Sequence, residues 1–405
     1  MSISSAIDAG LAPDGGLYVP ELFPQYQGGS FDIVETLAPF FEGDPLAPYL
    51  KEICENALNF PIPLRKLTGK FSGTAVLELY HGPTAAFKDV GARFLAECQS
   101  RLHQDQRTVL VATSGDTGGA VAAAFFGRKN FNVIILFPKG MVSARQLQQL
   151  TCWGGNVKAF AVKGTFDDCQ RMAKEAFADP WWKSNTTLTS ANSINIGRLI
   201  PQMTYYARAS IEYQKEFGKS PGFIIPSGNL GNAVAALWAK KMGFPIGKII
   251  MATNANKSVP DYLRTGVNTP HTTINTLANA MDVGNPSNLE RAIDLYPNIE
   301  DFRKDVESFS VSDEEIKSEI IEGAKEGNIW CPHTATAAHV RKTLNGDAWI
   351  MVSTAHPAKF ETIVEPLIGK TVEIPNELAS LLSKPSHYEE IDADLKAIPK
   401  SALKL

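Results

Sequence analysis

From about residue 107 onward, short apolar runs rich in β-branched residues alternate with small polar loops and with Ala- or Leu-rich stretches of helical spacing. The run RTVLVA at 107–112 leads through TSGDTGG to AVAAAFFG, and the same order recurs at 131–150, 155–177 and 222–243. A last apolar run, DAWIMVS at 347–353, leads through TAHP to another helical start. Apolar runs that alternate with helical stretches are typical of parallel strands joined by helices. The pattern therefore predicts an α/β fold built on parallel sheets.

The length of the chain predicts more than one domain. A single hydrophobic core stops growing at roughly 250–300 residues, and this chain has 405 residues. We expect two parallel-sheet α/β domains, a smaller one at 76–205 and a larger one at 206–405 that includes the C-terminal segment. Residues 1–75 are mixed in pattern and Pro-rich, which favours a separate N-terminal cap. We expect the binding site in the cleft between the two domains.

Five polar loops stand where parallel sheets bind ligands. In open parallel sheets, ligands lie beyond the carboxyl ends of the strands, where loops lead into helices. The loops in question are HGPTAAFKD, TSGDTGG, SANSINIGR, SGNLGN and STAHPAKF. These five segments are therefore the candidates for the binding site.

The loop SGNLGN follows an apolar strand and opens an Ala-rich helix. Backbone N–H groups at a helix start, together with the helix dipole, attract anions. The N–H groups of Gly228, Asn229, Leu230, Gly231 and Asn232 can therefore converge on a phosphate, and the two glycines allow close approach and positive φ. The loop lacks the G-x-G-x-x-G order of dinucleotide-binding proteins and the Lys-Ser/Thr pair of a Walker A loop. Taken alone, it is equally well an ordinary tight turn.

The loop TSGDTGG carries side chains that suit a substrate with both donors and acceptors, such as an α-carboxylate beside an amine. The groups are the hydroxyls of Ser114 and Thr117 and the carboxyl group of Asp116. Taken alone, however, this loop is more typical of an ordinary Asp/Ser helix cap.

The loop SANSINIGR brings amide, hydroxyl and guanidinium groups together ahead of a helix. The residues are Asn192, Ser193, Asn195 and Arg198. This set suits a phosphate monoester, because an arginine can bind two oxygens at once. Clusters of Asn and Ser are also common in plain loops, and the arginine makes this one more specific.

Lys88 is the candidate nucleophile. It falls in the first turn of a predicted helix whose apolar positions continue through Phe94. A cation there opposes the helix dipole, which lowers the pKa of the amine, and neutral amines form Schiff bases with aldehydes. The alternative is a surface lysine paired with Asp89 or Glu97, and it is the better interpretation of an isolated Lys-Asp pair. That alternative weakens because a phosphate loop, an acceptor loop and an arginine site occur in the same chain.

Composition and charge narrow the classes of function. The formal net charge is −4 and no long Lys/Arg block is present, so we expect neither a nucleic-acid nor a membrane partner. The five cysteines lack C-x-x-C and zinc-ligand spacing, which favours a reduced, cytoplasmic location without a metal site. The N-terminal stretch lacks the regions of a signal peptide, and no apolar run approaches the roughly 20 residues that span a bilayer. We expect a soluble protein.

In combination, these segments resemble one known group of enzymes. HGPTAAFKD, ATSGDTG, SANSINIGR, PSGNLGN, NAMDVGNPSN and STAHPAKF follow DGGLYVPE in order along nearly the whole chain. The combination resembles the pyridoxal-phosphate enzymes of the tryptophan-synthase β-subunit fold (fold type II), and within them the threonine synthase family. The resemblance implies two α/β domains with pyridoxal 5'-phosphate in the cleft between them.

The resemblance also assigns roles to residues. It implies that Lys88 forms a Schiff base with the cofactor and later carries protons, and that residues 228–232 hold the cofactor phosphate. It implies that the neutral hydroxyl group of Thr354 hydrogen-bonds the pyridine nitrogen. Two loops would bind the substrate: Ser114, Asp116 and Thr117 beside its carboxylate and the cofactor ring, and Asn192, Ser193 and Arg198 at its phosphate. Because many relatives in the wider fold carry Asn at the position of Asp116, an amide contact to the cofactor's phenolic oxygen is not carried over.

The reaction implied is the conversion of O-phospho-L-homoserine and water to L-threonine and phosphate, by a monomer or a homodimer. A phospholyase or a serine/threonine dehydratase with the same cofactor is the first alternative, and both stop at elimination and release a keto acid. A non-catalytic sensor of phosphorylated ligands is the second, and the intact Lys88 argues against it. A metal-dependent hydrolase is the third, opposed by the missing ligand set.

Overall fold

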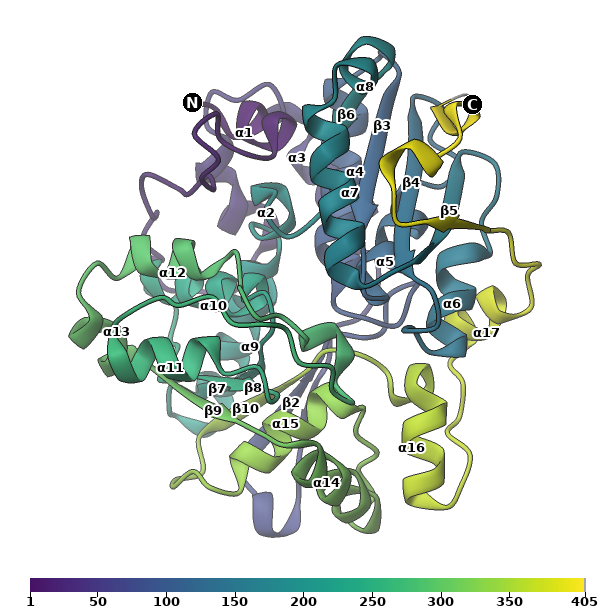
Figure 1. Ribbon diagram of the computed structural model, residues 1–405. Coiled ribbons are helices and arrows are strands. Elements are labelled where there is room, and N and C mark those ends of the chain that lie inside the picture. Colours follow the sequence, from purple (N-terminus) through teal and green to yellow (C-terminus); the bar gives the residue numbers. More distant parts are fainter. Residues whose placement is uncertain (404–405) are drawn as a thin grey trace.

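The computed structural model describes residues 1–403 and contains two β-sheets covered by helices (Figure 1). The smaller sheet is parallel throughout, in the order β11 (Glu389–Asp392), β5 (Val157–Lys163), β4 (Phe131–Pro138), β3 (Arg107–Ala112) and β6 (Thr187–Thr189). The larger sheet has the order β1 (Leu64–Lys66), β2 (Thr74–Glu78), β10 (Trp349–Ser353), β7 (Gly222–Pro226), β8 (Ile249–Thr253) and β9 (Val306–Ser310). Only the edge pairing of β1 with β2 is antiparallel. The predicted α/β fold with two parallel-rich sheets is confirmed.

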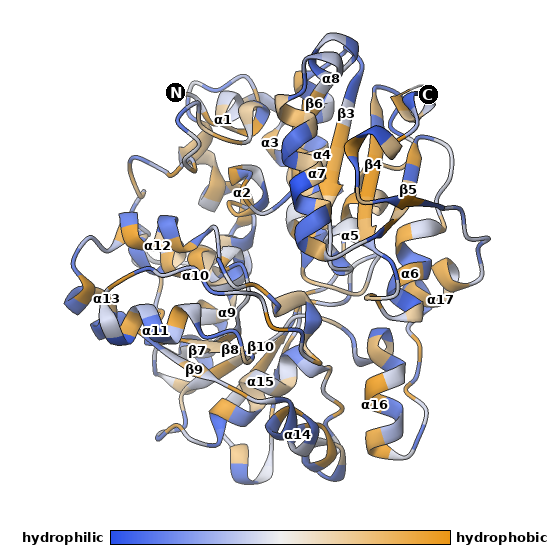
Figure 2. Cartoon of the chain, in the orientation of Figure 1, coloured by the Kyte–Doolittle hydropathy of each residue, from blue (hydrophilic) through white to orange (hydrophobic). Residues whose placement is uncertain are grey.

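The smaller sheet is buried on both faces. Val109 and Ile135 point to the core shared with α4 (Lys88–Leu102) and α5 (Asp116–Phe125). Leu110 and Ile134, one position along, point to α7 (Phe166–Ala178) on the other face. Figure 2 shows hydrophobic strands β3 and β4 beneath a largely hydrophilic outer surface of α7. Burial on both faces explains why these strands are continuous apolar runs. The remaining helices of this part are α6 (Ala144–Thr151) and α8 (Pro180–Asn185).

The larger sheet is also packed between two layers of helices. Ile225 and Met251 face the core that contains α9 (Gln202–Phe217) and α10 (Gly231–Lys241). Ile224 and Ile250 face a second core with α14 (Asp313–Lys325), α15 (Pro332–Arg341) and α16 (Glu361–Ile368). The other helices are α11 (Ser258–Thr265), α12 (Leu289–Leu295), α13 (Ile299–Asp305) and α17 (Asn376–Leu382).

The N-terminal segment packs against the core that both sheets share. It carries α1 (Ile3–Ala9), α2 (Ile33–Leu37) and α3 (Leu50–Ala57). Ile7, Leu37 and Ile53 are fully buried in the same cluster as α4 and α9. The segment therefore forms a cap that is continuous with the main core. Within residues 1–403, every helix is too short or too polar to span a bilayer.

Sheet membership crosses the domain limits expected from the sequence. Strand β2 belongs to the larger sheet, whereas the C-terminal strand β11 returns to the smaller sheet and pairs with β5. The ranges 1–75, 76–205 and 206–405 stay a prediction, and the two sheets are each built from separate parts of the chain.

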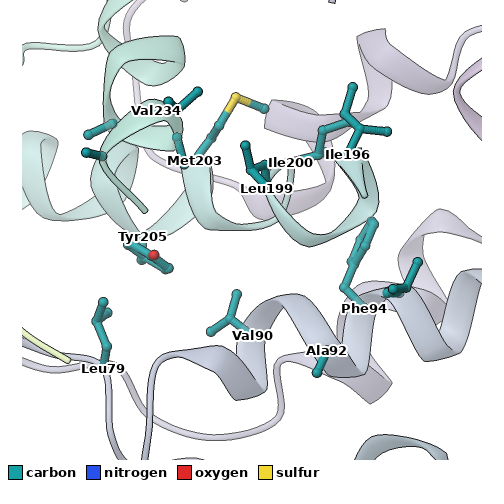
Figure 3. Packing of buried hydrophobic residues seen from close by; sticks show 14 of the residues in the cluster. Leu79, Val90, Ala92, Phe94, Ile196, Leu199, Ile200, Met203, Tyr205 and Val234 are labelled. Carbon is teal, nitrogen blue, oxygen red and sulfur yellow. The ribbon is translucent and has the colours of Figure 1, made fainter. Parts of the chain in front are cut away.

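Helix α4 packs closely on the segment that leads into α9. Figure 3 shows Val90 and Phe94 of α4 on the side that faces Leu199 of this segment. Gly91 permits the close approach, because a Cβ there would stand 2.5 Å from the carbonyl oxygen of Arg198. The packing brings the start of α4 next to the loop that carries Arg198.

Candidate active site

The turn before Lys88 is bound to the end of strand β10. The N–H of Phe87 donates to the carbonyl oxygen of Thr354 (2.8 Å), and the N–H of His356 donates to that of Ala85 (3.0 Å). Ala85 has a φ of 53°, a left-handed conformation that residues with a Cβ seldom adopt. The turn thus holds Lys88 at the carboxyl end of the larger sheet, although its helix packs on the smaller one.

The amine of Lys88 is shifted toward its neutral form. Burial lowers the pKa of Lys88 to about 8, with Asp116 opposing the shift and the cations of Lys359 and Arg198 adding to it. The sequence predicted a lowered pKa from the helix dipole. The main cause in the structure is instead the loss of hydration, which disfavours the charged amine.

Neither acidic residue considered as a partner for Lys88 pairs with it. The carboxylate of Asp89 is buried and accepts hydrogen bonds from the backbone N–H (2.8 Å) and the hydroxyl group (2.7 Å) of Thr84. Glu97 forms ion pairs with Arg101 and Arg128. The surface-lysine interpretation is therefore wrong.

A cavity of about 440 Å³ lies between the two sheets and includes Lys88 in its lining. Every residue to which the family resemblance assigned a cofactor or substrate role lines it. From the larger sheet's loops come Gly228, Asn229, Leu230, Gly231, Asn232 and Thr354, and from the other loops come Ser114, Asp116, Thr117, Asn192, Ser193 and Arg198.

The loop at residues 228–232 presents unpaired backbone donors to the cavity. Among the described residues, none of its N–H groups has a protein acceptor. The left-handed residue is Leu230, with a φ of 64°, so the expectation of positive φ at the two glycines was wrong. Gly228 is required for another reason, since a Cβ there would lie 2.7 Å from the Cα of Met281. Such a concave row of N–H groups at a helix start is suited to an anion.

The two asparagine side chains of this loop differ in their contacts. Asn229 donates to the hydroxyl oxygen of Ser193 (2.6 Å) and accepts from the N–H of Ser287 (2.7 Å), so it joins the loop to its neighbours. The amide oxygen of Asn232 accepts from the hydroxyl groups of Tyr205 and Tyr206. Its amide nitrogen has no partner among residues 1–403.

The loop SANSINIGR divides into a cavity part and a structural part. Arg198 is buried, donates to the carbonyl oxygen of Ala191, and has an Nε without a partner among the described residues. Burial lowers the pKa of Arg198 to about 10, opposed by Asp89, and it stays a cation at neutral pH. Asn195, grouped with it from the sequence, is absent from the lining of the cavity and donates to the carbonyl oxygen of Ile7 (2.9 Å).

Lys359 is a residue of the site that the sequence analysis missed. Its ammonium group is fully buried, 2.9 Å from a carboxylate oxygen of Asp116 and 2.8 Å from the carbonyl oxygen of Thr84. Gln146 donates to the same carboxylate oxygen (3.0 Å). Burial by itself would raise the pKa of Asp116, but the cations of Lys359 and Lys88 hold it well below its usual range. The sequence could have indicated Lys359, because this residue stands inside STAHPAKF, one of the five candidate loops.

Three family models together cover residues 1–401 of this chain. The model for the pyridoxal-phosphate dependent enzyme family matches residues 58–353. The models for the threonine synthase N terminus and the threonine synthase C-terminal region match residues 1–57 and 333–401. The threonine synthase of Haemophilus influenzae is 38% identical over 100% of this chain and 97% of its own length. This chain belongs to the threonine synthase family.

Solved structures of threonine synthases have the same fold. The crystal structure of threonine synthase from Escherichia coli superposes with a TM-score of 0.89 at 37% identity and covers 98% of this chain and 95% of its own. The structure of pyridoxal-phosphate-bound threonine synthase from Brucella melitensis gives 0.88 at 32% identity and covers 100% and 96%. The predicted enzyme class, a pyridoxal-phosphate-dependent lyase, is confirmed.

Proposed function

We propose that this member of the threonine synthase family converts O-phospho-L-homoserine and water to L-threonine and phosphate in the cavity around Lys88. One observation carries the proposal: a lysine with a pKa of about 8 shares one cavity with two separate sets of phosphate-binding groups. The first set is the row of N–H groups at 228–232, and the second is Asn192, Ser193 and Arg198. A phosphorylated cofactor and a substrate that loses phosphate need two such sets.

The first set of groups fits the phosphate of pyridoxal phosphate. N–H groups without an acceptor in residues 1–403, a left-handed Leu230 and the close approach at Gly228 make a concave anion site that needs no metal. The hydroxyl group of Thr354, which lines the cavity, suits the ring nitrogen, and the Lys88 amine suits the aldehyde. When bound, the cofactor supplies a ring that delocalises the electron pair left when the substrate loses its α-proton.

Lys88 moves protons at the reacting carbon atoms of the substrate. Its amine takes the proton from Cα, and a second proton leaves Cβ as the γ-phosphate departs. A proton is then added at Cγ, water adds at Cβ, and a last proton returns to Cα. A group with a pKa of about 8 suits both directions of transfer near neutral pH, because its two protonation states differ little in free energy.

The remaining groups orient the substrate. Arg198 is a buried cation whose Nε has no partner within the described chain, and it binds the substrate phosphate together with Asn192 and Ser193. The hydroxyl groups of Ser114 and Thr117 serve the α-carboxylate. Asp116 is engaged by Lys359, so its role is to hold the charge balance beside Lys88.

We also infer a cytoplasmic location. All five cysteines are free and buried in the described chain, as is usual in a reducing compartment. A monomer or a homodimer stays the prediction for the assembly.

Product analysis tests the proposed function. The holoenzyme is incubated with O-phospho-L-homoserine, and threonine, phosphate and keto acid are measured in the same sample. We expect threonine and phosphate in equal amounts. Phosphate with a keto acid in place of threonine would instead identify the phospholyase or dehydratase reaction. Absence of turnover would favour the non-catalytic sensor of phosphorylated ligands.

A further inference from the structure

His333 lines the same cavity as Lys88 and Thr354, yet it has no role in the proposed reaction. It lies in the first turn of α15, which begins after the N-cap Cys331. Its side chain is nearly enclosed, with 3% of the residue exposed, and its ring packs on that of Phe360 at a centroid distance of 4.9 Å. The imidazole is therefore held in one orientation beside the site.

The contacts of His333 define which ring nitrogen carries the proton. Nε2 accepts a hydrogen bond from the backbone N–H of Ala280 (3.1 Å), so Nε2 has no hydrogen. Burial lowers the pKa of His333 to about 4, with Asp116 opposing and the cations of Lys88 and Lys359 adding to the shift. The ring is thus neutral near pH 7, and its single hydrogen is on Nδ1.

The Nδ1–H of His333 has no acceptor among residues 1–403, and the atom is buried. An unpaired donor enclosed by protein costs stability. A molecule bound in the neighbouring cavity would remove this cost if it supplied an acceptor for the Nδ1–H.

We propose that the Nδ1–H of His333 donates a hydrogen bond to an anionic oxygen of the molecules bound in the cavity, so that His333 is a further binding residue. The inference rests on the proposed function, which brings two molecules with such oxygens into the cavity: the cofactor with its phenolic oxygen and the substrate with its α-carboxylate. A neutral donor suits this place, because the charges around it are already matched. Lys359 is paired with the carboxylate of Asp116, and the pKa of Lys88 is lowered toward that of a neutral amine.

Two substitutions of His333 separate the roles of its two nitrogens. His333→Asn puts an amide at the position of Nδ1 and removes the acceptor for Ala280. His333→Gln places an amide oxygen near the position of Nε2, where it can accept from Ala280, and leaves nothing at Nδ1. The matched pair therefore distinguishes a donor to the bound molecules from a structural support for residue 280.

Three measurements on the holoenzyme and its variants test the proposal. They are the dissociation constant and absorption maximum of bound pyridoxal phosphate without substrate, the KM for O-phospho-L-homoserine, and the thermal unfolding of the cofactor-free protein. We expect His333→Gln to weaken one of the two affinities by about tenfold or more, as for the loss of a hydrogen bond to a charged group. His333→Asn retains that affinity within about threefold.

The measurements on the cofactor and on the substrate together identify the acceptor. A change in cofactor affinity or absorption maximum without substrate assigns the phenolic oxygen, whereas a change confined to KM assigns the substrate carboxylate. Any other pattern overturns the proposal, including equal losses in both variants or a loss only in His333→Asn with lower thermal stability. When wild-type enzyme forms threonine and phosphate, such a result removes the role of His333 and leaves the proposed function intact.

Discussion

The ammonium nitrogen of Lys359 lies 2.9 Å from a carboxylate oxygen of Asp116, and both side chains are buried. Asp116 is the first residue of α5, which packs on the smaller sheet, and Lys359 follows β10 of the larger sheet. The pair therefore joins the two halves of the molecule directly beside Lys88. Because each charge is removed from water, each depends on the other for its stability.

Removal of one partner of this pair should destabilise the fold. Lys359→Met leaves the buried Asp116 carboxylate without its ion-pair partner, at a cost of about 3–5 kcal/mol in the free energy of unfolding. The pKa of Asp116 should rise, since burial then outweighs the remaining cations. Urea unfolding of the cofactor-free protein measures the change.

The double variant Lys359→Met/Asp116→Asn is the matched control. A neutral amide no longer needs the cation, so this variant should regain most of the lost stability. If the free energy of unfolding of Lys359→Met lies within about 1 kcal/mol of that of the wild type, the pair contributes no more than a surface ion pair does.

Replacement of Lys88 should abolish both cofactor attachment and catalysis. Lys88→Ala removes the amine that suits the aldehyde and the group that moves protons, so the visible absorbance of the attached cofactor and the turnover should both disappear. Lys51→Ala is the control, because Lys51 lies on the surface and pairs with Glu55. Retained turnover in Lys88→Ala would contradict the assignment.

The lowered pKa of Lys88 predicts how fast the cofactor-free enzyme takes up pyridoxal phosphate at each pH. Only the neutral amine attacks an aldehyde, and its fraction grows as pH rises through the pKa of about 8. The uptake rate, followed by visible absorbance, should therefore reach half its plateau close to pH 8. Nα-Acetyl-lysine amide in solution, whose only amine is the side-chain one, is the control, and its rate should still be rising above about pH 9 because its pKa is about 10.4. Equal pH profiles for the two amines would show that burial does not act on Lys88.

The close approach at Gly228 predicts a specific loss of cofactor affinity. The Cβ added in Gly228→Ala would meet the Cα of Met281 at 2.7 Å, so the backbone must shift, which typically costs about 1–3 kcal/mol. We expect affinity for pyridoxal phosphate to fall by about tenfold or more. In Gly231→Ala the nearest atom would be 3.4 Å away, and affinity should stay near that of the wild type. Equal affinities in the two variants would exclude the steric explanation.

The guanidinium of Arg198 should matter for the substrate and not for the cofactor. Arg198→Lys keeps the positive charge but loses the fork that binds two oxygens, so kcat/KM for O-phospho-L-homoserine should fall by about tenfold or more. The absorbance of bound cofactor should not change. Arg264→Lys, at an exposed pair with Asp261, controls for a general effect of the substitution. A loss of cofactor with no change in substrate kinetics would reverse the assignment of the two phosphate-binding sets.

Much of the site could be predicted because its residues stand at a recurring place in the chain. The sequence predicted loops between apolar strands and helices, and the carboxyl ends of parallel strands meet at one edge of a sheet. Residues as distant in sequence as Lys88, Arg198, Gly228 and Thr354 therefore line one cavity. Local order along the chain was sufficient for this part, together with the resemblance of the motifs to a known family.

Side-chain direction could not be predicted in the same way. Asn195 and Arg198 share one short loop, yet one binds Ile7 of the N-terminal cap and the other lines the cavity. Positive φ fell on Leu230 and not on the glycines beside it. Both outcomes depend on which neighbour supplies room or a partner, and the neighbours come from remote segments.

The sequence by itself determined the order of strands, loops and helices, and the types of side chain that each loop presents. Tertiary structure alone decided that Lys359 meets Asp116, that the buried Nδ1 of His333 has no partner among residues 1–403, and that β11 pairs with β5 in the smaller sheet. The physical reason is the distance along the chain between the residues that interact. Apolar periodicity and helix starts depend on residues a few positions apart, whereas buried charges and hydrogen bonds depend on contacts that exist only after both sheets have packed together.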